Sequence, residues 1–107
     1  MFLSRCKSKG KALTAPKDYR VDSFSWDDYL NETGTESVPP RAFKTKTSNI
    51  WKSGMKLEAV DIRNPSLIRV ATMVARTGHT IKIHFDGWSD KYDYWVFYYL
   101  DLFLFVN

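Results

Sequence analysis

The sequence predicts a mainly β fold: a small, strongly bent β-barrel of the SH3-like kind, preceded by an N-terminal arm that contains short helices. One observation is the period of the apolar residues, which changes to two from Met55 onward, as is typical of strands. The other is that these alternating stretches are short and separated by close turns. Short strands around one small core favour a curled sheet over two packed sheets.

The length and composition fit one globular domain without a metal or cofactor. The chain has 107 residues, enough for one small core but not for two. Its single cysteine, Cys6, excludes an internal disulfide, and His79 and His84 lack the spaced Cys or His partners of a metal site. We therefore expect an intracellular protein, with neither a signal peptide nor a transmembrane span.

The positive charge is concentrated in the first twenty residues. The formal net charge of the chain is +4, whereas residues 1–20 alone carry +5 and the remainder carries −1. The basic side chains of this arm are Arg5, Lys7, Lys9, Lys11, Lys17 and Arg20. Such an arm can make weak nucleic-acid contacts through residues 5–20, although a solvated, irregular terminus is the ordinary explanation.

A short helix is predicted from Trp26 to Thr33. Ser25 is a good N-cap with Asp28 three residues on, Phe24 and Tyr29 occupy the hydrophobic-staple positions, and Gly34 ends the helix. The apolar residues of the helix lie on one face, which we expect to pack on the domain body: Trp26, Tyr29 and Leu30.

A connector follows, because Pro39-Pro40 prevents a continuous helix. Pro40 can open one short turn containing Ala42, and we expect Phe43 and Trp51 to anchor the connector to the core.

Three strands are predicted next, over residues 55–60, 67–75 and 80–85, with a turn at residues 76–79 making a hairpin of the second and third. In the first strand, Met55, Leu57 and Ala59 share one face, with Lys56 and Glu58 opposite.

The stretch IKIHFDGWSDKYDYW, residues 81–95, is unusually rich in aromatic and acidic side chains. Phe85, Trp88 and Tyr92 surround the turn dipeptide Asp86-Gly87, so their ring faces can gather around one small volume that attracts an organic cation. Asp61 and Asn64, in the loop between the first two strands, can supply a carboxylate and an amide there. Ordinary core packing of the rings and turn capping by the loop residues are the alternatives.

Three stretches together resemble the malignant brain tumour (MBT) repeat, in particular the repeats of the lethal(3)malignant brain tumour-like chromatin proteins. They are FSWDDYLNETGTESVPPRAF, GMKLEAVDIRNPSLIRVATM and IKIHFDGWSDKYDYW, and CKSKGKALTAPKDY resembles the connector between repeats. The resemblance covers residues 6–96 and implies a Royal-superfamily, Tudor-like barrel in a tandem array. It divides the chain into a basic inter-repeat connector or arm (1–22) and the repeat (23–107), with a helical arm (23–50), a β-barrel core (51–96) and an atypical hydrophobic tail (97–107).

The resemblance also implies a function. The family's methyl-lysine pocket falls on Asp61, Asn64, Phe85, Trp88 and Tyr92, which makes the chain a nuclear chromatin reader of mono- and dimethyl-lysine in histone tails, serving transcriptional repression or chromatin compaction beside neighbouring MBT repeats. The lower methyl states keep an N–H for the Asp61 carboxylate, whereas trimethyl-lysine has none.

Other classes stay open at this point. A structural or protein-interaction repeat would fold in the same way without binding methyl-lysine, and a nucleic-acid binder would depend on residues 5–20. An enzyme is not expected, because the sequence has no recognisable nucleophile, phosphate-binding or metal-binding arrangement.

Overall fold

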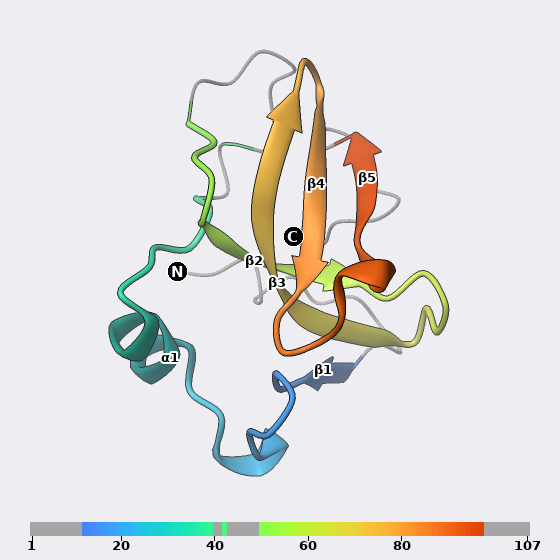
Figure 1. Cartoon of the computed structure of the whole chain (residues 1–107). Helices are drawn as coiled ribbons and strands as arrows, with labels where there is room; N and C mark the ends of the chain where they lie inside the picture. The colour runs from blue at the N-terminus through green and yellow to red at the C-terminus, as the bar shows by residue number, and fades with distance from the viewer. Residues whose placement is uncertain (1–11, 40–41, 43–49, 98–107) are drawn as a thin grey trace.

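The computed structural model describes residues 12–39, 42 and 50–97 (Figure 1). One mixed sheet contains β1 (Ala12–Thr14), β2 (Lys56–Val60), β3 (Leu67–Thr77), β4 (Thr80–Phe85) and β5 (Tyr94–Phe97). The helical elements are the 3-10 helices η2 (Val21–Ser23) and η4 (Asp90–Tyr92) and the α-helix α1 (Trp26–Thr33). The predicted mainly β fold with an N-terminal arm containing short helices is confirmed. No helix in the described residues is long and apolar enough to cross a membrane.

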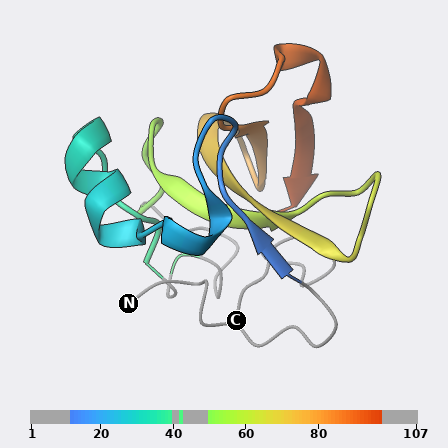
Figure 2. The ribbon, with the colours of Figure 1, turned by 90° about the horizontal axis from the view of Figure 1, so that it is seen from below.

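β3 is the centre of the sheet. Its residues 68–69 pair with β1 in parallel and with β2 in antiparallel fashion, so β1 and β2 lie on opposite edges. Residues 71–72 pair with both β2 and β4, which places β4 after β1 along the same edge. A register shift between Met73 and Ala75 marks a bulge that increases the local twist. The sheet therefore curls around its inner face (Figures 1 and 2).

β5 extends the sheet beyond β4 and turns back toward β2. Val96 pairs with Ile81, and the Tyr94 hydroxyl donates a hydrogen bond to the Val60 carbonyl oxygen at 2.8 Å. Burial raises the pKa of Tyr94, and the nearby Asp61 carboxylate raises it further, so this hydroxyl keeps its proton at neutral pH. One side-chain contact thus joins the first and last barrel strands.

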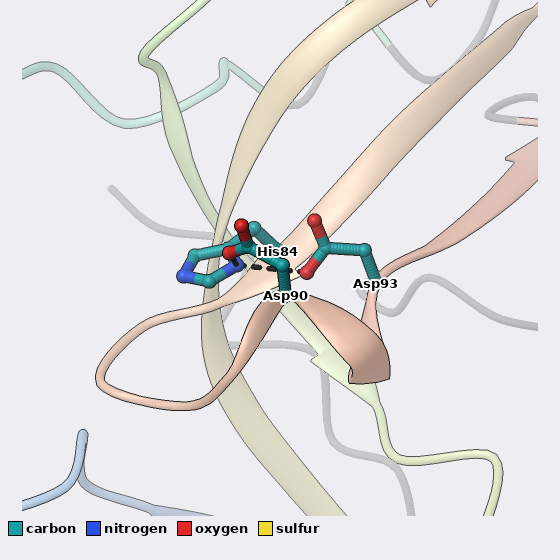
Figure 3. Close-up of side chains that lie close together, drawn as sticks. All are labelled: His84, Asp90 and Asp93. Carbon is teal, nitrogen blue, oxygen red and sulfur yellow. Dashed lines mark hydrogen bonds and ion pairs between the residues drawn. The ribbon is translucent and has the colours of Figure 1, made fainter.

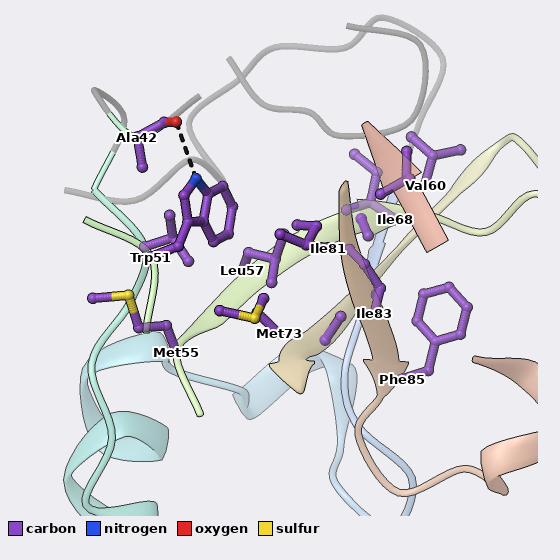
Figure 4. Packing of buried hydrophobic residues seen from close by; sticks show 14 residues of the cluster. Ala42, Trp51, Met55, Leu57, Val60, Ile68, Met73, Ile81, Ile83 and Phe85 are labelled. Atoms are coloured by element: carbon purple, nitrogen blue, oxygen red, sulfur yellow. Dashed lines mark hydrogen bonds between the residues drawn. The ribbon is translucent and has the colours of Figure 1, made fainter. Parts of the chain in front are cut away.

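The core lies on the concave face of the sheet (Figure 4). It takes side chains from every barrel strand and from the connector, among them Val38, Leu57, Met73, Ile81, Ile83 and Phe85, each at most 2% exposed. Trp51 is buried and its indole N–H donates to the Ala42 carbonyl oxygen at 3.1 Å, which confirms it as an anchor. Pro40, Phe43 and the tail after Phe97 lie outside the described residues.

The α1 helix begins and ends where the sequence predicts. The Ser25 side chain accepts from the Asp28 N–H at 3.3 Å, and Gly34 adopts φ 66° after the last helical residue. The staple residues Phe24 and Tyr29 have ring centroids 5.4 Å apart. Trp26 and Tyr29 are buried, with Val70 of β3 in the same cluster, so the predicted apolar face packs on the sheet.

Two local predictions are wrong. The arm is not irregular throughout: the N–H of Ala12 donates to the Ser66 carbonyl oxygen at 3.0 Å, and β1 uses an edge of β3 that β4 leaves unpaired. The hairpin turn is Gly78-His79 alone, with Arg76 and Thr77 still in β3, because Gly78 at φ 59° permits a two-residue turn. The first error comes from a pairing partner that is distant in the sequence, which local patterns do not reveal.

A buried polar network fastens the helix α1 to the sheet. Asp86 accepts from Lys56 Nζ at 2.8 Å, from the Tyr29 hydroxyl at 2.5 Å and from the Thr72 hydroxyl at 2.5 Å. Glu58 accepts from the Trp26 indole N–H at 2.7 Å. Lys56 and Glu58 do lie opposite the core face of β2, but α1 covers that face, so the whole strand is buried.

Substitution of Lys56 by Met tests this network. The change leaves the Asp86 carboxylate, only 6% exposed, without its cation, and an unpaired buried charge costs about 3–5 kcal/mol. We expect the free energy of unfolding in urea at pH 7 to fall by that amount. The matched control, Lys82→Met on the half-buried face of β4, should cost less than about 1 kcal/mol; equal losses would contradict a special role for the buried pair.

Candidate functional site

Two of the three rings of the predicted aromatic cage, Trp88 and Tyr92, lie together on the segment between β4 and β5. The Trp88 N–H donates to the Phe85 carbonyl oxygen at 3.0 Å, closing the turn that carries Asp86-Gly87, and Tyr92 is the last residue of η4. The rings of Trp88 and Tyr92 are 6.1 Å apart between centroids at 88°, an edge-to-face pair. Both are half-buried against the core and leave part of their surface to solvent.

Contacts of His84 with two carboxylates hold this segment in place (Figure 3). The His84 Nδ1 atom lies 2.7 Å from an oxygen of Asp93 and 3.5 Å from an oxygen of Asp90. Ser89 caps η4 by accepting from the Lys91 N–H at 3.3 Å. These contacts fix the residues on either side of Tyr92.

The side chains of His84, Asp90 and Asp93 offer donor atoms within 4.8 Å of one another, as the ligands of a metal ion do. The sequence prediction considered only Cys and His as partners of His84 and so missed both carboxylates. Asp90 is 93% exposed, and a short His–carboxylate hydrogen bond already accounts for the grouping. We assign these residues the anchoring of the loop.

Phe85, the third predicted ring, lies in the core. It is 1% exposed, and its ring packs against Tyr94 with centroids 5.7 Å apart. Its alternation with Ile81 and Ile83 on β4 continues to the end of the strand, as the core alternative requires. The structure therefore supports packing for Phe85, and a direct contact with a ligand stays a prediction.

Asp61 follows directly after β2 and is 1% exposed. Its carboxylate accepts from Arg69 Nε at 2.7 Å, from the Arg63 backbone N–H at 2.9 Å and from Arg63 Nη2 at 3.2 Å. Burial alone would raise the pKa of this carboxyl, but the hydrogen bonds from Arg69 and Arg63 outweigh it and leave the pKa below its ordinary value. Asp61 is consequently ionised at neutral pH.

Asn64 holds the conformation of the loop and makes no described hydrogen bond to the Asp61 carboxylate. Its backbone N–H donates to the Asp61 carbonyl oxygen at 2.9 Å, and its side-chain oxygen accepts from the Ser66 hydroxyl at 2.8 Å. The residue is exposed in the turn. These contacts match the turn-capping alternative, so a direct role of Asn64 in binding stays a prediction.

Two arginines that the sequence analysis did not single out connect Asp61 to the rings. The guanidinium carbon of Arg63 lies 4.1 Å from the Tyr92 ring centroid, and that of Arg69 lies 5.0 Å from the Trp88 centroid. Each arginine therefore contacts the carboxylate and one ring. The available signal was Arg69 itself, the one charged residue in the apolar run LIRVATMVA.

The N-terminal arm passes close to the segment between β4 and β5 that carries Gly87 and Trp88. Gly87 has φ 84°, and a Cβ placed there would lie 2.7 Å from Lys17 Cβ and 2.9 Å from the Lys17 backbone nitrogen. The Lys17 ammonium lies 5.9 Å from the Trp88 ring centroid. Gly87 is thus required both for its backbone conformation and for the close approach of the arm.

Comparison with known proteins gives consistent matches. A family model described as mbt repeat matches residues 55–103. Over 92 residues, or 85% of its length, this chain is 54% identical to mouse lethal(3)malignant brain tumor-like protein 1 and 51% identical to mouse lethal(3)malignant brain tumor-like protein 4. Human lethal(3)malignant brain tumor-like protein 4 is 49% identical over the same share. The chain spans only 11% of the length of the first relative and 15% of the other two.

One similar solved structure contains the four MBT repeats of Drosophila melanogaster Sfmbt in complex with the peptide RHR (me)K VLR. It aligns with a TM-score of 0.49 and 31% identity, covering 85% of this chain and 21% of that one.

Substitution of Gly87 by Ala is expected to destabilise the domain more than the same change at Gly78. Both glycines have positive φ, which costs an alanine roughly 1–2 kcal/mol, but only Gly87 also faces the arm backbone. Urea unfolding of the two variants measures the difference. Equal losses would show that Lys17 does not press against Gly87 in solution.

The stability contributed by Asp61 should depend on pH in one direction. Because its folded-state pKa lies below the ordinary value of 3.8, the contribution is fully present above about pH 4 and is lost as the pH falls through the folded-state pKa. The difference in unfolding free energy between the wild type and Asp61→Asn should therefore shrink below about pH 4. Asp22→Asn, in the exposed arm, is the control, and a difference unchanged down to pH 2 would contradict the assignment.

Proposed function

This chain contains an MBT repeat of the kind found in lethal(3)malignant brain tumor-like proteins, and we propose that it is a chromatin reader module for mono- and dimethyl-lysine of histone tails. The proposed cage consists of Trp88 and Tyr92 with the Asp61 carboxylate, while Phe85 and Asn64 support the strand end and the loop. In the full-length protein it acts in the nucleus beside neighbouring repeats, in transcriptional repression or chromatin compaction.

One observation carries this proposal: two arginines join an ionised, buried carboxylate to two perpendicular rings, each arginine contacting the carboxylate and one ring. Asp61 and the two rings already bind guanidinium groups within the chain, at 2.7 and 3.2 Å on the carboxylate side and 5.0 and 4.1 Å on the ring side for Arg69 and Arg63 respectively. A methylammonium group has the same requirements, namely a positive charge, apolar methyl surface for a ring face and, in the lower methyl states, an N–H for the carboxylate.

The chemistry favours the lower methyl states. Each ring that faces the cation contributes about 0.5–2 kcal/mol, depending on how well water is excluded. The N–H of mono- or dimethyl-lysine adds a charge-assisted hydrogen bond to Asp61 of roughly 1.5–3 kcal/mol, which trimethyl-lysine cannot make. Unmodified lysine is disfavoured because its ammonium is more strongly hydrated. A single inserted side chain gives weak affinity with little dependence on peptide sequence.

The proposal is tested by titrating the protein with peptides that carry unmodified, monomethyl-, dimethyl- or trimethyl-lysine. The titration is monitored by two-dimensional amide NMR. We expect signals of Asp61, Trp88 and Tyr92 to shift with the mono- and dimethyl peptides and hardly with the other two. Trp88→Ala should weaken binding roughly tenfold or more, which corresponds to the loss of one ring contact and its packing.

The controls separate the cage from general effects. Trp95→Ala removes an indole that is 49% exposed on β5, outside the site, and should bind as the wild type does. Asp61→Asn should bring dimethyl- and trimethyl-lysine to similar affinity in a variant whose spectrum stays dispersed. A dispersed wild-type spectrum that no peptide shifts would instead make this a structural or protein-interaction repeat.

A further inference from the structure

We propose that the guanidinium group of Arg69 occupies the cage in the free protein and must leave before a methyl-lysine can enter, so that Arg69 sets the affinity of the site. This inference rests on the proposed function, because it concerns the same cage. It assigns to Arg69 the role of an internal competitor for the ligand.

The contacts of Arg69 are those that the ligand needs. Its Nε donates to Asp61 Oδ2 at 2.7 Å, the shortest hydrogen bond described for this carboxylate, and its guanidinium carbon lies 5.0 Å from the Trp88 ring centroid. One cation therefore holds the anion and one ring face of the cage at the same time. A methylammonium bound by Asp61 and Trp88 would claim that same position.

Arg69 is better placed for this role than Arg63. The Arg63 side chain is 48% exposed on the turn, whereas that of Arg69 is 16% exposed and starts from the middle of the sheet. The backbone of Arg69 is fixed by pairing with Ala59 of β2 and Thr14 of β1, so only its side chain can move away. Arg69 Nη1 also lies 3.5 Å from the Thr14 hydroxyl, which draws the guanidinium toward the arm.

A competitor within the chain lowers affinity in a recognisable way. The apparent dissociation constant equals the intrinsic one divided by the fraction of molecules whose cage is open. Because this fraction is a property of the free protein, Arg69 weakens every methyl state by the same factor. A residue that instead positioned Asp61 for its hydrogen bond would affect mono- and dimethyl-lysine much more than trimethyl-lysine.

The experiment compares Arg69→Met with the wild type, using the same four peptides and the same NMR titration. Methionine keeps an unbranched chain but has neither charge nor donors. We expect all methylated peptides to bind more tightly by a common factor of about three or more. Arg76→Met, the same exchange on the same strand away from the cage, should leave affinity within about twofold of the wild type and controls for the lost charge.

The outcomes are distinguishable. If the wild type binds and Arg69→Met binds equally or more weakly, the inference fails while the proposed function stands. If neither binds any methylated peptide, the proposed function fails and this inference with it. If Arg69→Met binds and the wild type does not, both hold, and the free cage is fully closed.

A second measurement decides the matter if Arg69→Met does not fold. The Arg69 Nε–H signal of the wild type should be protected from exchange in the free protein and lose that protection when dimethyl-lysine peptide saturates the site. Protection that persists at saturation would overturn the proposal, because Arg69 would then still be bound to Asp61. Arg69→Lys, which keeps the charge but not the planar fork, should bind with intermediate affinity.

Discussion

The Asp86 carboxylate is the interaction on which most of this structure depends. It accepts hydrogen bonds from β2, from β3 and from α1, while its own backbone N–H donates to the Val70 carbonyl oxygen at 3.1 Å. A buried charge tolerates loss of its partners poorly, so these three elements must be in place together around Asp86. The next two residues are Gly87 and Trp88, which means that the group fastening the helical arm also fixes where the candidate cage begins.

A second buried carboxylate, Asp61, has a different setting. Asp86 is paired with Lys56, whose side chain is 11% exposed, inside a closed network that also buries the Tyr29 hydroxyl. Asp61 is paired with Arg63, whose side chain is 48% exposed, and with Arg69 of β3, whose side chain is 16% exposed, and both lie over aromatic rings. Exchange of a surface-facing cation is far less costly than exchange of an enclosed one. Asp86 is thus committed to the fold, whereas Asp61 has one partner, Arg63, that faces solvent.

The N-terminal arm belongs physically to the domain from Ala12 onward. β1 completes one edge of β3, Leu13 packs against both hydrophobic clusters, and Lys17 lies so close to Gly87 that there is no room for a Cβ there. In the sequence this region has the composition of a basic connector between repeats. Its residues 12–17 nevertheless contact the strand that carries Arg69 and the loop that carries Trp88, which couples the arm to the candidate site.

Local chemistry by itself determined the α1 helix with both its caps, the hairpin of β3 and β4, the anchor Trp51 and the grouping of Trp88 with Tyr92, because each depends on residues close together in the chain. The identity of the family likewise followed from short motifs. The tertiary structure decided what depends on distant partners: that Ala12–Thr14 is a strand, that Lys56 and Glu58 are buried, that Phe85 belongs to the core, and that Arg63 and Arg69 stand between Asp61 and the rings. Hydrogen-bonding partners supplied by another segment leave no periodic trace in the sequence. The contacts of Arg69, a lone arginine in an apolar strand, with the Asp61 carboxylate and the Trp88 ring therefore became visible only in the folded sheet.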